Sequence, residues 1–454
     1  MKFADYKKEY GALTRLGVPI TIAQVGMTLQ GLADTLMVGH HSTEELSAAG
    51  FVNAIFVLGI LMTIGYSQSA VSQIGAYFTQ GRTRDIVRVL KASMVADTAQ
   101  CLLITGVLTA FWFCLPYIGQ PAELLPLMQR YYLILLPSLP VLAAASAFRP
   151  FSDSINDTRT SMWILLAGNV WNVLFNWVLI YGHWGFPELG LDGAAWATAS
   201  SRLFLLALYA FVFFGTRRYA QYRALWREVK LDWREMRLLN RLGWPIAVQM
   251  GMEIASFSLV TVFLGWGGRG WDGVSALAAH QVILQLSQFV FMFYVGIGSA
   301  VAIRVANYHG LGDTPGVRRA ADAGYHMIVL LGIVMSVACF LMRWEFTGFF
   351  IEADGSELFL RVQREVALLA WPLVLYQFGD GMQTCYVNAL RGYGDVKVLM
   401  KYCFIAYLVI SLPLSYVFAI TLDGGAFGAW MGFPFGLTAA AVLYYRRFRR
   451  ITTR

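Results

Sequence analysis

Apolar residues run through this chain in long stretches that short polar segments separate. We delimit twelve such stretches, at 11–38, 47–78, 87–115, 123–149, 160–182, 188–215, 239–265, 274–308, 318–342, 359–390, 397–421 and 423–445. A helix needs about 20 mostly apolar residues to cross a bilayer. The pattern therefore predicts an all-α polytopic membrane protein with twelve transmembrane helices, of which the longest tilt, bend or extend beyond the bilayer.

The composition supports a membrane protein. Hydrophobic residues make up 57% of the 454 positions and charged residues 14%, whereas soluble domains carry about 25% charged residues. The net charge of +8 does not indicate nucleic-acid binding, because Lys and Arg anchor membrane loops beside anionic lipid. The first stretch is too long for the apolar part of a secretory signal, so we expect it to be a retained span.

The placement of Lys and Arg predicts the orientation. When the N-terminus is put in the cytoplasm, the segments on that side hold most of the 35 Lys and Arg residues. Cytoplasmic loops are enriched in these residues. We therefore expect both termini in the cytoplasm. Separately, we expect the chain to be a monomer.

One charged segment divides the chain. It reads TRRYAQYRALWREVKLDWREMRL at 216–238 and carries aromatic residues at helical spacing. This pattern predicts an amphipathic helix along the cytoplasmic membrane surface. We expect an N-terminal lobe at 1–215, this linker at 216–238, and a C-terminal lobe at 239–454.

The two halves repeat one another. RLGVPI at 15–20 matches RLGWPI at 241–246, and Gly65, Tyr77 and Gly81 match Gly296, Tyr308 and Gly312 in the same order. Each half holds six spans, so both halves enter the membrane from the same side, and a pseudo-twofold axis along the membrane normal relates them. Such repeats are typical of transporters that alternate access by rocking one bundle against the other.

Several classes of function are excluded by missing motifs. The chain has no GxxxxGK[ST] motif and no soluble segment large enough for a nucleotide-binding domain. Its five cysteines form no CxxC pair, and no catalytic set of His, Ser or Cys residues is visible. We therefore expect no enzyme activity and no cofactor, and transport that an ion gradient drives or that is passive.

Three acids lie inside predicted spans: Asp34, Glu253 and Asp380. A charged side chain at the bilayer centre costs about 2.5–3.5 kcal/mol on insertion scales, and no Lys or Arg lies near these acids in their own spans. A cation or a proton is the expected partner, with Na⁺ possible at Glu253 and Asp380; a structural ion pair is the alternative. Tyr376 lies one turn before Asp380, either as a cation–π partner or as a core tyrosine.

A second polar group surrounds Asp34. Gln30 lies one turn before it, Asn172 and Asn176 lie one turn apart in the fifth span, and Thr198 lies in the sixth. These residues form either a hydrogen-bond network around Asp34 or ordinary polar contacts between helices. Asp97, Arg202 and Asp322 receive no role from the sequence.

These features together resemble the multidrug and toxic compound extrusion (MATE) family, in its NorM-like branch. The most specific pieces are ADTLMVGH at 33–40, the surroundings of Glu253, LIYGHWGFPELGLDGAAWATA at 179–199, and QFGDGMQTCYVNALRGYGDVK at 377–397. The resemblance implies two lobes with a drug cavity between them, in a bacterial inner membrane. It also implies antiport of Na⁺ or H⁺ against hydrophobic organic cations.

The resemblance also implies roles for residues. The positions of Glu253, Tyr376 and Asp380 are associated with the coupling cation, and that of Asp34 with coupling in the first lobe. Asn176 stands where related transporters carry an acid, which favours the second-lobe site. The alternatives are a lipid-linked precursor flippase, which would favour a basic cavity, and a membrane enzyme.

Overall fold

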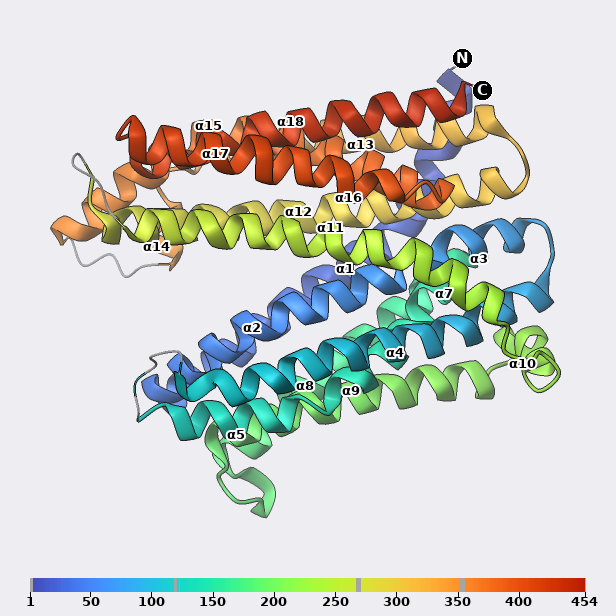
Figure 1. Ribbon diagram of the computed structural model, residues 1–454, viewed down its shortest axis with the longest axis horizontal. Coiled ribbons are helices and arrows are strands. Elements are labelled where there is room, and N and C mark those ends of the chain that lie inside the picture. The colour runs from blue at the N-terminus through green and yellow to red at the C-terminus, as the bar shows by residue number, and fades with distance from the viewer. Residues whose placement is uncertain (1–2, 118–120, 122, 267–270, 351–355, 454) are drawn as a thin grey trace. The chain divides into compact units, whose positions relative to one another are not determined.

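The described chain is helical throughout. The computed structural model describes residues 3–117, 121, 123–266, 271–350 and 356–453, and these ranges hold helices and no β-strand (Figure 1). Within them, eleven helical segments are long and apolar enough to cross a membrane. A further helix, α15 (Glu357–Tyr393), is 37 residues long and carries charged residues at several positions along its length. With α15, the prediction of twelve membrane-spanning segments is confirmed.

Within the described residues, nine spans are single helices: α15, the two helices that begin the halves, and six others. The first half begins with α1 (Phe3–His41) and the second with α11 (Trp233–Gly265). The other single-helix spans are α4 (Thr83–Cys114), α8 (Thr158–Tyr181), α9 (Gly190–Gly215), α12 (Gly273–Gly310), α13 (Thr314–Leu341) and α18 (Gly425–Thr452). A short helix, α14 (Phe346–Phe350), precedes α15.

Three spans are divided into shorter helices. The second consists of α2 (Thr43–Ser67) and α3 (Ala70–Thr79), and the fourth consists of α5 (Leu125–Leu135), α6 (Ser138–Ser146) and α7 (Phe148–Ser154). The eleventh consists of α16 (Lys397–Cys403), the π-helix η4 (Phe404–Ser411), α17 (Leu412–Tyr416) and the π-helix η5 (Val417–Thr421). π-Helical turns are rare and occur often at functional sites.

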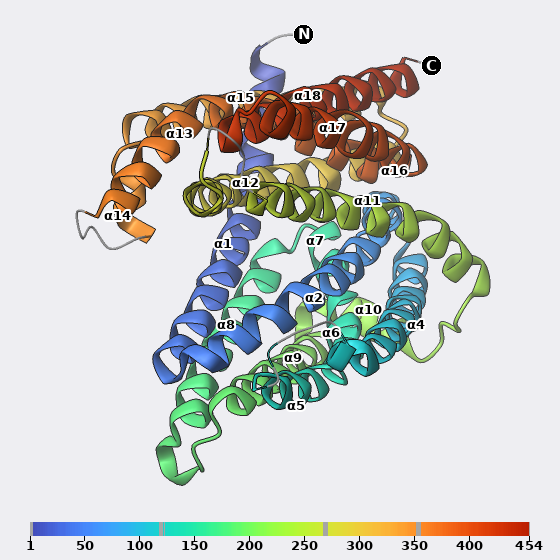
Figure 2. The same cartoon turned by 60° about the vertical axis from the view of Figure 1, so that its left-hand side comes forward.

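The helices form two compact units, and within each the long helices lie side by side (Figures 1 and 2). Unit 1 consists of Met1–Thr21 with Val248–Arg454, and unit 2 of Ile22–Ala247. The units therefore divide inside α1 and α11, not at the boundaries of the predicted lobes, 1–215 and 239–454. Each division falls two residues after a proline inside the helix, Pro19 or Pro245. Proline removes a backbone hydrogen bond there, so each helix changes unit at a weakened turn.

Close contacts at two glycines hold the first part of α1 in unit 1 and the first part of α11 in unit 2. In unit 1, a Cβ at Gly17 would lie 3.2 Å from the carbonyl oxygen of Gly296, which brings α1 and α12 together. In unit 2, a Cβ at Gly243 would lie 2.6 Å from the ring of Tyr66, which brings α11 against α2. Small residues permit such close helix crossings in membrane proteins. The sequence repeat around RLGxPI thus corresponds to a repeated packing contact.

The prediction of a single helix over 216–238 is wrong. The segment holds a 3₁₀ turn at Arg217–Tyr219 and the short helix α10 (Ala220–Trp226), and α11 begins at Trp233. The chain between the helices is held to α4, because Lys91 Nζ donates to the Val229 carbonyl oxygen at 2.8 Å. Aromatic spacing could not reveal this contact with another helix.

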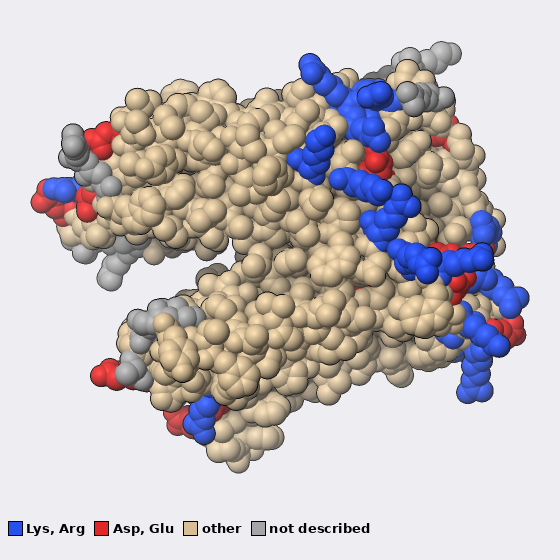
Figure 3. Space-filling view, viewed as in Figure 1, with Lys and Arg blue, Asp and Glu red and all other residues tan. Residues whose placement is uncertain are grey.

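Lys and Arg side chains gather at one end of the helices in each unit (Figure 3). In unit 2 this end holds Arg82, Arg84, Arg88, Lys91, Arg159, Arg217 and Arg218, among others. In unit 1 it holds Lys7, Lys8, Arg318, Arg319, Lys397 and the run of arginines near the end of α18. The sequence predicts the loops at this end to be cytoplasmic, and that orientation stays a prediction.

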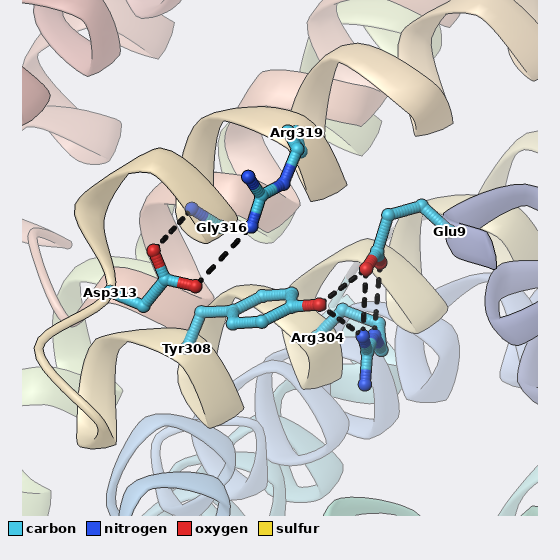
Figure 4. Close-up of polar contacts among 6 residues, drawn as sticks. All are labelled: Glu9, Arg304, Tyr308, Asp313, Gly316 and Arg319. Atoms are coloured by element: carbon cyan, nitrogen blue, oxygen red, sulfur yellow. Dashed lines mark hydrogen bonds and ion pairs between the residues drawn. The ribbon is translucent and has the colours of Figure 1, made fainter. Parts of the chain in front are cut away.

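A buried ion pair fastens the start of α1 within unit 1 (Figure 4). Arg304 of α12 donates to both carboxylate oxygens of Glu9, at 3.1 and 2.9 Å, and the Tyr308 hydroxyl also donates to Glu9. The Glu9 side chain is 5% exposed and that of Arg304 is 22% exposed. Next to this group, Asp313 accepts from the Gly316 backbone and from Arg319.

We predict that Arg304→Gln lowers the free energy of unfolding by about 2–4 kcal/mol, because Glu9 is then left buried without a cation. Unfolding in mixed detergent micelles measures this change. The matched control is Arg361→Gln, which breaks the exposed pair with Glu357 (56% and 81% exposed) and is expected to cost about 1 kcal/mol or less. Equal losses in the two variants would contradict the role of the buried pair.

We also predict the labelling pattern of Cys114, the one exposed cysteine of the five. It ends α4, opposite to the basic end at Arg84. A membrane-impermeant maleimide should label Cys114 in intact cells. In a Cys114→Ser background, Arg84→Cys should be labelled only after the membrane is permeabilised. The reverse pattern would invert the predicted orientation.

Candidate functional site

The structure brings the predicted first-lobe residues together in unit 2. Asn176 Nδ2 of α8 donates to Asp34 Oδ1 of α1 at 2.5 Å and lies 3.2 Å from Asn172 Oδ1. Asn172 Nδ2 in turn lies 3.5 Å from the Thr198 hydroxyl of α9. Asn172 and Asn176 are fully buried. The chain of contacts links three helices and ends on the Asp34 carboxylate.

Asp34 lies on a cavity within unit 2. The cavity has a volume of about 330 Å³, and Gln30 and Thr198 also line it. Three residues that the sequence analysis left without a role in this site line it as well: Asn53, Tyr131 and Arg202. The Tyr131 hydroxyl donates to Asn53 Oδ1 at 3.3 Å.

Arg202 places a positive charge among these polar groups. Its guanidinium donates to the Ser138 hydroxyl at 2.6 Å. Arg202 also lines a neighbouring cavity of about 250 Å³, together with Gln30, Thr198 and Arg149. Its position one turn after Thr198 is the signal that could have assigned it to this group.

Glu253 lies at the centre of a second polar cluster, in unit 1. Gln249, one turn earlier in α11, donates to Glu253 Oε2 at 3.0 Å. The Tyr407 hydroxyl, from the π-helix η4, donates to Glu253 Oε1 at 3.1 Å and accepts from Gln383 Nε2 of α15 at 2.8 Å. Both oxygens of this carboxylate are therefore held.

An arginine from outside the predicted spans lies near Glu253. Arg391, near the end of α15, donates to Gln249 Oε1 at 2.6 Å. Gln249 therefore links a guanidinium to the Glu253 carboxylate without a direct ion pair. The sequence placed Arg391 in a loop, but α15 continues to Tyr393, and the arginine belongs to its last turn.

Asp380 differs from Glu253 in its partners. It is 1% exposed, and its Oδ1 atom has no hydrogen-bond partner among the described residues. Glu253 lies within electrostatic range of it. A buried carboxylate oxygen that lacks a partner and lies near a second carboxylate is suited to receive a proton or a cation.

Tyr376 stands in an aromatic group next to this acid. It is 5% exposed. Its ring centroid lies 5.6 Å from that of Trp430 and 6.3 Å from those of Phe257 and Phe433. Tyr376 therefore shares the interior of unit 1 with Asp380, as its spacing in the sequence indicates.

Other buried polar residues have structural partners. His280 is fully buried and contacts Trp430 Nε1 at 3.0 Å and the Thr261 hydroxyl at 2.9 Å. Asp322 pairs with Arg449 at 2.7 Å. Asp97 Oδ2 accepts from the Ser93 hydroxyl at 3.1 Å, whereas its buried Oδ1 has no partner among the described residues. Among the described residues, no group of three or more His, Cys, Asp or Glu side chains could hold a metal ion.

Known proteins resemble this chain over nearly its whole length. The family model MatE matches residues 19–178 and 245–417, and the two matches begin at the paired prolines Pro19 and Pro245. The multidrug resistance protein NorM of Vibrio cholerae is 29% identical over 447 residues, which cover 97% of this chain and 95% of that protein. A probable multidrug resistance protein NorM of Rhizobium meliloti is 30% identical and covers 99% of this chain, with 95% of its own length matched.

Solved structures share the fold. The eukaryotic MATE transporter AtDTX14 matches with a TM-score of 0.84 at 18% identity, over 98% of this chain and 99% of that chain. A Vibrio cholerae MATE transporter, VcmN, matches with a TM-score of 0.86 at 16% identity, over 99% and 98% of the two chains.

We predict that Tyr407→Phe lowers the free energy of unfolding by about 1–3 kcal/mol, because it leaves Glu253 Oε1 and Gln383 Nε2 without their shared partner. Chemical unfolding in detergent measures the loss. Tyr416→Phe in the same span is the control, since Tyr416 is 40% exposed, and it should be nearly neutral. A neutral Tyr407→Phe would mean that the hydroxyl does not hold the cluster together.

Proposed function

Because this chain belongs to the MatE family, we propose that it is a multidrug efflux transporter which exchanges Na⁺ or H⁺ for hydrophobic organic cations. Family membership rests on the MatE match over most of the chain, and multidrug export on the names of its relatives. The coupling ion and the class of substrate are our proposals.

The observation that supports ion coupling is the carboxyl pair of unit 1. Glu253 has hydrogen bonds to both of its oxygens, whereas Asp380 keeps a buried oxygen without a partner among the described residues. An acid at membrane depth is costly and normally marks an ion pathway. We assign the coupling ion to Asp380 and Glu253, with Tyr376 beside them.

The first-lobe cluster offers a second place for an ion or a substrate. The hydrogen-bond partner of Asp34 is Asn176. An acid at position 176 would instead form a pair of carboxyl groups with Asp34. A single carboxylate with amide neighbours can bind one proton, whereas Na⁺ prefers several oxygen ligands. We therefore assign Asp34 to the reaction cycle and place the main ion site in unit 1.

Coupling requires only that the affinity for the drug differ modestly between the ion-bound and the ion-free protein. An ion that neutralises Glu253 and Asp380 weakens their attraction for a cationic drug, and its release restores that attraction. A coupling free energy of about 1–3 kcal/mol suffices. Exchange of one monovalent ion for one monovalent drug gains nothing from the membrane potential, so a concentration gradient or more than one ion per drug must drive it.

A lipid-linked precursor flippase is the second candidate, and one observation favours it. Arg149 and Arg202 both line the 250 Å³ cavity, which has no Asp or Glu among its lining residues. A basic cavity suits a pyrophosphate group. Asp34, which lines the neighbouring cavity, and the acids of unit 1 favour the exporter.

The decisive experiment is export of a fluorescent organic cation from proteoliposomes, driven in turn by a Na⁺ gradient and by a pH gradient. We predict that Glu253→Gln with Asp380→Asn reduces ion-driven export at least about tenfold, since each removes a charge that the ion must neutralise. Glu357→Gln, an exposed acid in α15, is the control and should export normally.

The outcomes separate the candidates. Export driven by the Na⁺ gradient alone would indicate that these residues coordinate Na⁺. Export driven by the pH gradient alone would indicate that the carboxyl groups carry protons. Export by the double variant at the normal rate would exclude the unit 1 pair as the ion site. No response to either gradient would reject antiport and favour the flippase.

A further inference from the structure

Another cavity in unit 2 lies apart from Asp34 and its network. It has a volume of about 390 Å³ and lies between α4 and the first half of α11, with Tyr66 of α2 beside them. The lining residues lie at helical spacing on one face of each helix: Ala96, Ala99, Gln100 and Leu103 from α4, and Trp233, Met236, Arg237, Asn240 and Trp244 from α11. None of these residues belongs to the proposed transport site.

Gln100 is an amide without a partner in this cavity. It is 3% exposed, and neither its Oε1 nor its Nε2 atom has a hydrogen-bond partner among the described residues. Nearly all buried polar groups are hydrogen-bonded, so such an amide needs an explanation. Asn240, in contrast, accepts a hydrogen bond from the Tyr66 hydroxyl at 2.6 Å. A ligand with acceptor oxygens would satisfy the Nε2 donor of Gln100.

The charge of the cavity is positive. Arg237 is the one charged residue among those that line it, and its side chain is exposed. The cavity lies near the basic end of unit 2, since Lys91 of α4 contacts the Val229 carbonyl just before α11 begins. At about 1.5 Å per residue, Gln100 lies about 13 Å further along α4 than Lys91.

The walls beyond these polar groups are apolar. Leu103, which is 64% exposed, and Trp244 lie beyond the amides along their helices, whereas Trp233, which is 71% exposed, lies one turn before Arg237 at the start of α11. Tryptophan gathers at the level of lipid headgroups, and basic pockets between helices at the cytoplasmic face bind anionic headgroups. Along the cavity from the basic end of unit 2, the guanidinium of Arg237 comes first, the amides of Asn240 and Gln100 follow, and the apolar side chains of Trp244 and Leu103 come last.

We propose that this cavity binds one anionic glycerophospholipid. Arg237 holds its phosphate, the side-chain NH2 groups of Gln100 and Asn240 donate to its ester oxygens, and one acyl chain lies against Trp244 and Leu103. The volume suits the headgroup region and the start of a chain, and the remainder of the lipid lies in the bilayer. An organic cation fits less well, because Arg237 would repel it and no acid lines the cavity to attract it.

The test is lipid binding to the purified, delipidated protein in neutral detergent, measured by native mass spectrometry and by the shift in unfolding temperature. The probes are phosphatidylglycerol and phosphatidylcholine with identical chains. We expect tighter binding of one phosphatidylglycerol, and about tenfold weaker binding after Arg237→Gln. Arg234→Gln, the same change of charge on the same helix but outside the cavity, should retain the selectivity.

Gln100→Leu distinguishes binding from stability. Because it removes a buried amide without a partner, this variant should unfold at the same or a higher temperature without lipid, yet show less stabilisation by phosphatidylglycerol. Equal binding of the two lipids, or equal losses in Arg237→Gln and Arg234→Gln, would overturn the proposal. The assay measures lipid binding and not transport, so its result is independent of the proposed antiport.

Discussion

The absence of water inside a bilayer is the constraint on which the structure depends. Backbone groups in the hydrocarbon region must pair within the chain, which restricts spanning segments to helices or closed barrels. The same constraint acts on side chains, and it explains why the polar residues form connected chains inside each unit. Asn176 and Asn172 extend from Asp34 in unit 2, and Gln249 and Tyr407 enclose Glu253 in unit 1.

Against this background, buried polar atoms that lack partners among the described residues are informative, and two of them lie where a ligand could bind. Asp380 keeps a buried carboxylate oxygen free, and Gln100 keeps both of its amide atoms free. Their surroundings differ. A second carboxylate lies near Asp380, which suits a cation or a proton, whereas Arg237 shares the cavity of Gln100, which suits an anionic molecule. One physical rule thus points to two different ligands.

The spans and the acids could be predicted from sequence because each has a local signal. A span needs a long apolar run, and an acid inside such a run is conspicuous. The partners of the acids could not be predicted in the same way. Tyr407 approaches Glu253 from a π-helix in another span, and Arg391 acts through Gln249 from the end of α15. Their contacts depend on which helices are neighbours, and periodicity along one helix does not contain that information.

The exchanged ends of α1 and α11 have a consequence for biosynthesis. Unit 1 contains residues up to Thr21, which are made before all of unit 2, yet the rest of unit 1 begins at Val248. Unit 2 is complete only when the chain has been made as far as Ala247. The N-terminal end of α1 must therefore wait in the membrane, with Glu9 lacking Arg304, until the second half is inserted. Contacts that join such distant parts of a chain form slowly. Insertion factors and proteases therefore have most opportunity to act after the first half has been made and before the second half is inserted.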